Sequence, residues 1–544
     1  MVKKLAPYFI IVFFAAFGGY SLLHSGFPPT HDGEYHIMRF WQFEKVINDG
    51  AIFPRWAPDF NNGYGIPLFT YQYPLPNYAA YLFSLFGASL IDSFKLNLFF
   101  AHVFSAVFFY LWTRRFWGEL GGITSSIFYS FAPYRFVDIF VRGSVGEVWA
   151  LAMFPAFLWS FTSYIDKPSR LSFLFSVLFL ALGIYSHNIL ALMFFIFSVF
   201  YIAILIRDKR KKIFQNSLLI ISLGLGLASP FFIPALFEKN LVTALSVFDL
   251  TLHFPDLYQL LIPSWGTGFS GITSSNPMSF QIGIANLLVI FISIIVFLFF
   301  RKRAKHEEMV LFMIVSFFVV FFLMLSVSIT IWKIVPLLNY FQFPWRLLSL
   351  EIVITAFLSG TIVSLVKSFK RKLLITVILS ALVIISTISY AKFAYYHDRT
   401  DEYYLSRPNF TDGTNSIGNS FNTIWLNRIP DKRKKKIEIL NGKASIERIL
   451  EKSNRLEFVI NAREDMDARV NIAYFPNWKA YINGKKTSVI NNKGIINIKI
   501  PEGKNEIILK YESSGIEKTS YVIFLISIIV LILSLNKLAI IKKQ

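Results

Sequence analysis

About a dozen long apolar runs divide this chain of 544 residues. A helix rises about 1.5 Å per residue, so roughly 20 apolar residues cross a hydrocarbon core about 30 Å thick. Hydrophobic residues make up 55% of the chain and include 60 Phe, more than a water-soluble domain carries. The sequence therefore predicts an α-helical polytopic membrane protein of about 12 spans. The expected spans are residues 5–23, 93–112, 119–137, 145–164, 171–188, 190–206, 214–235, 281–300, 309–331, 346–366, 373–391 and 520–540.

Short basic segments between these runs set the expected topology. They include residues 114–115, 207–212, 301–305 and 370–372, and short loops rich in Lys and Arg stay in the cytoplasm. Both chain ends are then cytoplasmic, and the polar loops that carry candidate site residues are extracytoplasmic. The apolar piece at residues 78–91 would break this alternation if it spanned the membrane. We therefore expect it to be interfacial or re-entrant.

The charge and the Cys content exclude several function classes. Topology-setting basic residues account for much of the net charge of +21, so no nucleic-acid partner is expected. With no Cys, the chain forms no disulfides, does no thiol chemistry and holds no metal through Cys. The expected location is the cell membrane.

The polar segments predict the domain organisation. Residues 1–391 form a multi-span membrane domain whose first external loop, residues 24–77, is dense in Pro, Gly and aromatic residues and reads as a rigid lid. Residues 392–519 form an extracytoplasmic β-rich domain, because alternating apolar residues recur in short runs. Asn483-Gly484 predicts a tight hairpin there. Residues 520–544 form the last transmembrane helix and a cytoplasmic tail.

A charged cluster follows the first span directly. The stretch THDGEYHIMR contains the candidate catalytic acids Asp32 and Glu34, with His31, His36 and Arg39 as candidate substrate-binding residues. Ionisable groups beside a bilayer often mark a site, although a loop at the water interface is the alternative. Two carboxylates this far apart do not converge on one atom, so we expect one general base, Asp32.

Metal binding is left open by the same stretch. The spacing of His31, Asp32 and His36 allows a divalent cation to bind. No cofactor is certain from the sequence.

Further candidates for substrate binding lie in the external loops. Arg142 and Arg346 offer planar recognition of a lipid-linked phosphate, or they snorkel to lipid headgroups. Glu147 follows Arg142 and can neutralise it, whereas His187 is equally well explained as a helix-end residue. The remaining candidates are Arg55, Trp56 and Tyr73 of the first loop, and Gln342.

Several motifs together carry a family resemblance. The first-loop acid, RGSVGE, SHN, FQFPWR and the C-terminal AYFPNWKAYINGKK resemble the bacterial membrane proteins labelled 6-pyruvoyl-tetrahydropterin synthase-related, which look like members of the GT-C superfamily of glycosyltransferases. The resemblance implies a polyprenyl-phosphate sugar donor and an inverting transfer in which Asp32, with Glu34 as its neighbour, activates the acceptor. The pterin name gains no support, because the eight His are scattered along the chain.

The expected function is therefore hexosyl or pentosyl transfer to a glycan, lipid or protein of the cell envelope, with membrane lipid as a further partner. A transporter or flippase of a lipid-linked or anionic substrate is the competing hypothesis. It predicts charges at mid-membrane in broken helices and an internal repeat, neither of which is visible in the sequence. A structural role in envelope assembly is a third alternative.

Overall fold

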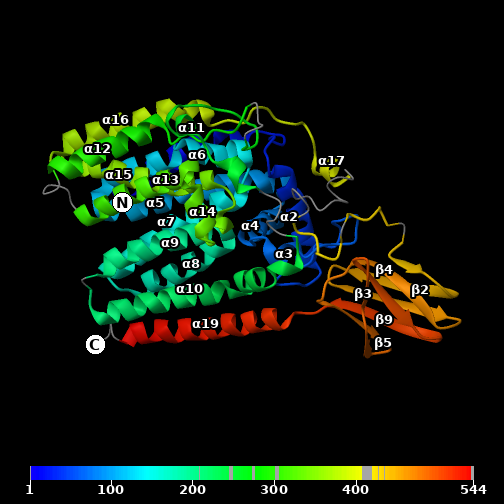
Figure 1. The fold of residues 1–544 in the computed structure, drawn as a ribbon. Coiled ribbons are helices and arrows are strands. Elements are labelled where there is room, and N and C mark those ends of the chain that lie inside the picture. The colour runs from blue at the N-terminus through cyan, green and yellow to red at the C-terminus, as the bar shows by residue number, and fades with distance from the viewer. Residues whose placement is uncertain are drawn as a thin grey trace.

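The computed structural model describes residues 2–207, 209–243, 249–271, 276–300, 306–406, 420–426, 428–433 and 435–540. A bundle of long helices carries a β-sandwich at one end, as Figure 1 shows. Both chain termini lie at the other end of the bundle. The basic segment 301–305, expected to be cytoplasmic, lies outside the described residues.

Eight described helices are long and apolar enough to cross a membrane. Three shorter apolar helices accompany them. The longest element, α5, covers two expected spans and is interrupted at Gly118, whose φ of 75° is not helical. The eight are α5 (Leu90–Ser130), α7 (Val145–Asp166), α9 (Asn188–Ile206), α10 (Lys211–Phe237), α13 (Glu307–Met324), α15 (Leu348–Ser364, preceded by η9, Pro344–Leu347), α16 (Phe369–Thr387, extended by η10, Ile388–Tyr390) and α19 (Gly515–Ile540); the shorter three are α1 (Val2–Gly18), α8 (Arg170–Ser186) and α12 (Ile284–Phe300). The multi-span fold expected from the sequence is confirmed.

Burial orders these helices from centre to periphery. The apolar windows of α7 and of η9–α15 are 89% buried, whereas that of α19 is only 17% buried. A helix that is apolar on all sides is buried in protein or faces lipid. Helices α7 and α15 therefore form the centre of the bundle, and α19 presents most of its surface to lipid.

One expected span ends earlier than predicted. The apolar run 309–331 predicted a single helix, but α13 stops at Met324. The Ser328 hydroxyl donates to the carbonyl oxygens of Leu323 and Leu325, and the Trp332 indole also donates to Leu323. These bonds satisfy the last carbonyls of α13, as helix C-termini require. The short elements η7 (Ser326–Ser328) and α14 (Ile329–Ile334) follow.

The first external loop is more helical than expected. It follows η1 (Tyr20–Leu23), contains α2 (Gly33–Asn48) and α3 (Leu68–Tyr71), and leads into α4 (Leu75–Leu85). With 11 residues, α4 is only about 16 Å long, too short to span, in keeping with the expectation for residues 78–91. The other connecting elements are α6 (Pro133–Phe136), η2 (Val137–Arg142), η3 (Lys239–Leu241), η5 (Leu250–His253), α11 (Leu257–Leu261), η8 (Leu338–Phe341) and α17 (Asp401–Ser406).

Two antiparallel sheets form the sandwich. Their strand orders are β1-β4-β8-β7 and β2-β3-β9-β5-β6, and a separate hydrophobic core fills the space between them. Strands β5 and β6 pair through the two-residue turn Asn483-Gly484, whose φ angles of 50° and 78° suit a type I′ hairpin. The strands are β1 (Ile437–Ile439), β2 (Ala444–Lys452), β3 (Arg455–Ala462), β4 (Met466–Ala473), β5 (Trp478–Ile482), β6 (Lys485–Thr487), β7 (Ile490–Asn492), β8 (Ile495–Ile500) and β9 (Gly503–Tyr511).

The first loop joins the sandwich to the bundle. Trp56 packs in the sandwich core, with its ring centroid 5.6 Å from that of Trp478 and 5.8 Å from that of Tyr511. The neighbouring Arg55 turns the other way and donates to the Pro230 carbonyl at 2.7 Å and to the Tyr521 hydroxyl at 3.1 Å. Consecutive residues thus fix the loop to both parts of the protein.

Candidate functional site

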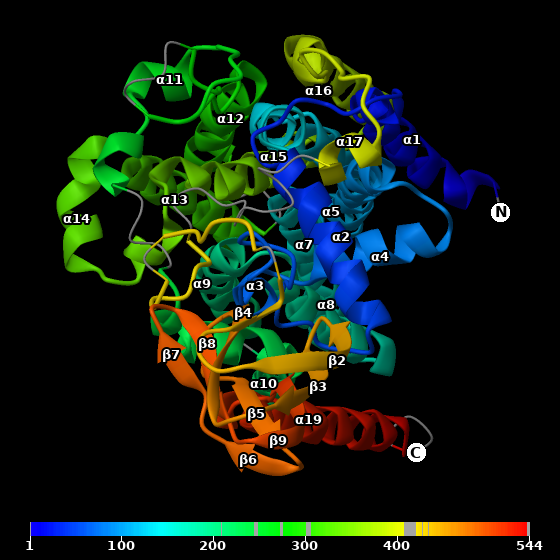
Figure 2. The same cartoon turned by 90° about the vertical axis from the view of Figure 1, so that its right-hand side faces the viewer.

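A polar cavity of about 330 Å³ lies where the first loop meets the bundle, at the end that faces the viewer in Figure 2. Its walls come from α2, from the segment after η2, from the α8–α9 bend and from the η8–η9 turn, which are distant in sequence. The lining residues are His31, Asp32, Tyr35, His36, Arg39, Tyr73, Arg142, Ser144, His187, His253, Phe269, Ser270, Met278, Gln342, Phe343, Trp345, Arg346, Ser420 and Phe421.

Backbone hydrogen bonds fix Asp32 beside Arg142. The amides of His31 and Asp32 donate to the carbonyls of Val141 and Arg142, at 3.0 and 2.9 Å. At the helix start, the Thr30 hydroxyl accepts from Gly33 N, and Asp32 makes no capping bond from its N-cap position. An N-cap Asp usually accepts such a bond. Its carboxylate is therefore left for the cavity.

Within the described chain, the Asp32 carboxylate has no hydrogen-bond or ion-pair partner. At longer range, the carboxylate interacts electrostatically with the guanidinium groups of Arg39 and Arg142. It can accept a proton from a hydroxyl that enters the cavity.

Glu147 lies behind the cavity wall and pairs with both site arginines predicted to bind phosphate. Its Oε2 is 2.8 Å from Arg142 Nη1, and its Oε1 accepts from Arg346 Nε at 2.8 Å. Tyr134 donates to Oε2 at 3.2 Å, and Glu147 is fully buried. Asp138, one turn before Arg142 in the π-helical η2, accepts a further bond from Arg142 at 2.7 Å.

The three arginines that line the cavity consequently differ in whether a described carboxylate pairs with them. Two carboxylates, Asp138 and Glu147, already neutralise Arg142 and Arg346. Arg39 makes no hydrogen bond or ion pair with a described residue, and its guanidinium lies 5.8 Å from the Tyr35 ring centroid and 5.7 Å from that of Phe421. Arg39 is the better candidate for binding an anionic group, since its charge is not paired. This ranking reverses the emphasis that sequence reasoning placed on Arg142 and Arg346.

Two histidines of the α2 start are neutral in their surroundings. Burial lowers the pKa of His31 below 6.5 against the raising effect of the Thr267 carbonyl, which its Nε2 contacts at 2.9 Å. Burial, and then Arg39, lower the pKa of His36 much further. His36 is 1% exposed, and neither of its ring nitrogens has a hydrogen-bond partner in the described part of the chain.

His187 forms the bend between α8 and α9. Its Nδ1 accepts from Leu190 N at 3.2 Å, which caps α9, and its Nε2 lies 3.9 Å from Glu147. Its ring is 4.8 Å from that of Tyr73. His187 therefore caps a helix end, which was one alternative from the sequence, and it also lines the cavity.

Gln342 occupies an uncommon backbone conformation. Its φ of 67° and ψ of −48° form a γ-turn in which Phe343 N donates to the Phe341 carbonyl at 2.7 Å. Such turns are rare and strained, and strained residues often lie at functional sites. The turn aims the Gln342 side chain at Arg346, which donates to it at 2.8 Å.

Four predicted site residues do not line the cavity: Glu147 lies behind its wall, and Glu34, Arg55 and Trp56 lie elsewhere. Glu34 is not among the residues that line the cavity, since successive positions at a helix start diverge. Arg55 binds α10 and α19, and Trp56 is a sandwich core residue. Sequence reasoning missed His253, Phe343 and Trp345 as lining residues. Phe343 and Trp345 belong to the FQFPWR motif beside Arg346, so this motif could have indicated both as site residues.

Metal ligands do not cluster in the described part of the chain. It contains no group of three or more His, Asp or Glu residues suited to hold an ion. His31, Asp32 and His36 therefore share the cavity without forming such a group.

Comparison with known proteins identifies the family. The model of the 6-pyruvoyl-tetrahydropterin synthase related domain, a membrane protein, matches residues 69–394, which is more than half of the chain. The chain belongs to this family. A second model, that of the bacterial membrane protein YfhO, matches residues 415–524 and covers the sandwich.

Two individual proteins are similar to this chain at low sequence identity. An uncharacterized protein of Lactococcus lactis subsp. cremoris is 22% identical over 240 residues, 42% of this chain and 39% of that protein. An oligosaccharyltransferase of Archaeoglobus fulgidus in its apo form is 12% identical, with a TM-score of 0.45, 75% of this chain covered and 60% of that one. Its complex with Zn and sulfate gives 13% identity, a TM-score of 0.41, and coverage of 73% and 57%. The chain therefore spans less than two thirds of each of these proteins.

Proposed function

We propose that this protein is a membrane glycosyltransferase that moves a sugar from a polyprenyl-phosphate-linked donor to a cell-envelope acceptor on the extracytoplasmic face. The observation that carries the proposal is that the Asp32 carboxylate and the Arg39 guanidinium line one cavity and that neither pairs with a described residue. The family resemblance to GT-C glycosyltransferases supports the same reaction class.

In the proposed reaction, an acceptor hydroxyl oxygen attacks the anomeric carbon of the donor sugar. Asp32 takes the hydroxyl proton, a bond forms between the acceptor oxygen and the anomeric carbon, and the bond to the phosphate oxygen breaks. The lipid phosphate leaves with the electron pair. Arg39 stabilises the negative charge on this leaving group, so no general acid is required.

The other residues of the cavity would hold the reactants in position. Trp345 and Phe343 stack with ring centroids 5.1 Å apart in the cavity wall beside Arg346, and this stack would help to hold the Arg346 guanidinium in place. Glu147 orients both Arg142 and Arg346, so its effect on transfer is indirect.

The test is sugar transfer by purified protein in liposomes, with polyprenyl-phosphate hexoses and pentoses as donors and envelope lipid and glycan extracts as acceptors. We expect Asp32→Asn to lower the rate by about 10²–10⁴-fold. Glu34→Gln, on the neighbouring acid outside the cavity, is the matched control and should retain activity. Equal rates for wild type and Asp32→Asn would remove Asp32 from the mechanism, and failure to consume any donor would contradict the proposed function.

One observation favours the transporter alternative. Glu351 in the spanning helix α15 is fully buried, and neither carboxylate oxygen has a hydrogen-bond partner among the described residues. Ionisable residues inside a membrane often mark proton or substrate paths. Flux of a lipid-linked sugar across liposomes that is lost in Glu351→Gln, without sugar transfer, would establish this alternative.

A further inference from the structure

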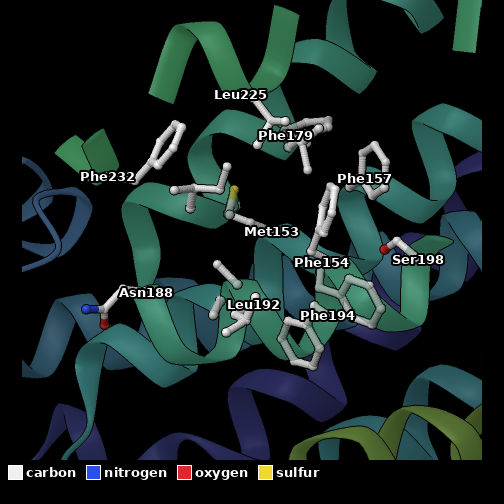
Figure 3. A pocket seen from close by; sticks show the side chains of 16 residues that line it. Met153, Phe154, Phe157, Phe179, Asn188, Leu192, Phe194, Ser198, Leu225 and Phe232 are labelled. Atoms are coloured by element: carbon white, nitrogen blue, oxygen red, sulfur yellow. The ribbon is translucent and has the colours of Figure 1, made fainter. Parts of the chain in front are cut away.

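A charged hollow of about 460 Å³ lies at the end of the bundle opposite the polar cavity. It differs from the apolar cavity between α7, α8, α9 and α10 in Figure 3, which no charged side chain lines. The residues that line the hollow are Arg114, Arg115, Gly118, Glu119 and Asp166. Helix α7 begins beside the polar cavity, and its 22 residues end at Asp166, about 33 Å away. This length matches the thickness of a hydrocarbon core, so the hollow lies at the opposite membrane surface, which is expected to be cytoplasmic.

The turn at Gly118 shapes the hollow by folding α5 back on itself. The φ of 75° and ψ of −175° at Gly118 interrupt the helix, and a Cβ built on Gly122 would lie 2.8 Å from Arg114 Cβ. In a continuous helix these two residues would be about 12 Å apart. A Cβ built on Gly118 would have no neighbour within 4 Å among the described residues. The space beside the turn is therefore open to a ligand.

Arg114 is held in place, yet no described carboxylate pairs with it. Its Nη1 donates to the Tyr8 hydroxyl at 3.1 Å, and its guanidinium lies 5.2 Å from the Tyr110 ring centroid. A guanidinium has five N–H groups in a planar arrangement that suits phosphate oxygens. Arg114 therefore keeps N–H groups for an anionic ligand in the hollow.

The two carboxylates of the hollow differ in their pairing. Asp166 accepts two bonds from Arg115, at 2.6 and 2.9 Å, so these two charges neutralise each other. The exposed carboxylate of Glu119 forms no hydrogen bond or ion pair with another described residue. One positive group, on Arg114, and one negative group, on Glu119, therefore remain for a ligand.

These two groups restrict the chemistry of the ligand. A purely anionic headgroup would satisfy Arg114 but would bring a second negative charge beside Glu119, which is unfavourable. A phosphate joined to a primary ammonium group satisfies both, because the ammonium group donates N–H bonds to a carboxylate. The quaternary ammonium of a choline headgroup has no N–H group to donate. The hollow thus favours a zwitterion with a primary amine.

We propose that the hollow binds a phosphoester that carries a primary ammonium group, with the phosphate on Arg114 and the ammonium group on Glu119. At a membrane surface, the headgroup of phosphatidylethanolamine supplies this chemistry, and free phosphoethanolamine supplies it from solution. The site lies on the opposite side of the membrane domain from Asp32. Binding there is therefore independent of the proposed sugar transfer.

The first experiment measures lipid binding to the delipidated full-length protein by mass spectrometry of the intact complex. Phosphatidylethanolamine, phosphatidylcholine and phosphatidylglycerol with identical acyl chains are compared. We expect phosphatidylethanolamine to bind at least about tenfold more tightly than the other two, since a hydrogen bond between charged groups is lost in each of them. Equal binding of all three lipids, or tightest binding of phosphatidylglycerol, would overturn the inference. Free phosphoethanolamine that binds more tightly than the lipid would support the same chemistry with a soluble ligand.

The second experiment repeats the comparison with charge variants. Glu119 is exposed, so its replacement should not disturb folding. Glu119→Gln should remove the preference for ethanolamine over choline, and Glu119→Lys should reverse the preference toward phosphatidylglycerol by about tenfold. Arg114→Gln should weaken all three lipids by about tenfold, because each of them carries the phosphate.

Glu308→Lys is the matched control for the charge reversal. Glu308 is 53% exposed and belongs to the Arg207–Glu308 pair at the same end of the bundle. We expect this variant to keep the preference of the wild type. A reversal in Glu308→Lys as large as that in Glu119→Lys would overturn the inference, because it would show an effect of surface charge in general rather than a site.

Discussion

Neutralising the buried acid Glu147 is the most direct test of how the site is held together. In Glu147→Gln the side chain keeps its shape but loses its charge. Arg142 retains Asp138 as a partner at 2.7 Å, whereas Arg346 keeps no carboxylate among the described residues. Arg346 is 4% exposed, so only water inside the cavity that it lines could replace the lost partner.

The expected loss follows from this burial. Removing one partner of a buried ion pair destabilises a protein by about 3–5 kcal/mol, because the remaining charge is uncompensated. The pair Arg207–Glu308 has the same separation of 2.8 Å, but its side chains are 60% and 53% exposed. Glu308→Gln is therefore the matched control, with an expected loss of at most about 1 kcal/mol.

The assay is unfolding of the purified protein in detergent, followed by tryptophan fluorescence. A loss below about 1 kcal/mol in Glu147→Gln would refute the reasoning, since it would mean that water or another group reaches Arg346. The double variant Glu147→Gln/Arg346→Met removes the orphaned charge and should recover part of the stability. Additive losses would equally contradict a direct pair.

Two further predictions concern stability. The depressed pKa of His36 means that below about pH 6.5 the unfolded chain binds a proton that the folded protein does not, so stability should fall with decreasing pH by up to about 1.4 kcal/mol per pH unit. His36→Phe should lack this part of the slope in thermal unfolding at pH 5–7, and an unchanged slope would contradict a neutral buried ring. A Cβ on Gly360 would overlap the Trp117 indole and lie 2.6 Å from Ser125 Oγ, where α15 meets α5. Gly360→Ala should therefore lower the free energy of unfolding by about 1–3 kcal/mol, while Gly183→Ala should not, because a Cβ there has Met153 Cβ, at 3.9 Å, as its nearest neighbour.

Local sequence patterns predicted much of the fold. The apolar runs indicated the long helices because a span needs a continuous apolar stretch, which is visible without tertiary information. The Asn483-Gly484 pair indicated its hairpin because few residues adopt positive φ. Residues 485–490 form one short run in the sequence, yet they are divided between β6 and β7 of different sheets. Strand partners depend on distant residues, so this division has no local signal.

The site shows the same division between local and distant information. We chose Asp32, Arg142 and Arg346 as candidates because their loops are expected on the same side of the membrane. The structure places all three around one cavity. Which arginine keeps an unpaired charge depends on Glu147, which lies 199 residues from Arg346. Arg55 and Trp56 share the loop with these residues but face α19 and the sandwich. Proximity in sequence could not distinguish an anchor from a binding residue.

The anchor at Arg55 also imposes an order on biosynthesis. Its hydrogen-bond partner Tyr521 lies 466 residues further along the chain. At about 5–20 residues per second, a ribosome needs roughly 20–90 s to make that stretch. Throughout this interval the first loop has neither its α19 contact nor its sandwich core. The first loop, which carries Asp32, is therefore anchored through Arg55 only when the last helix is in place, and a chain released earlier would carry a loop without this anchor.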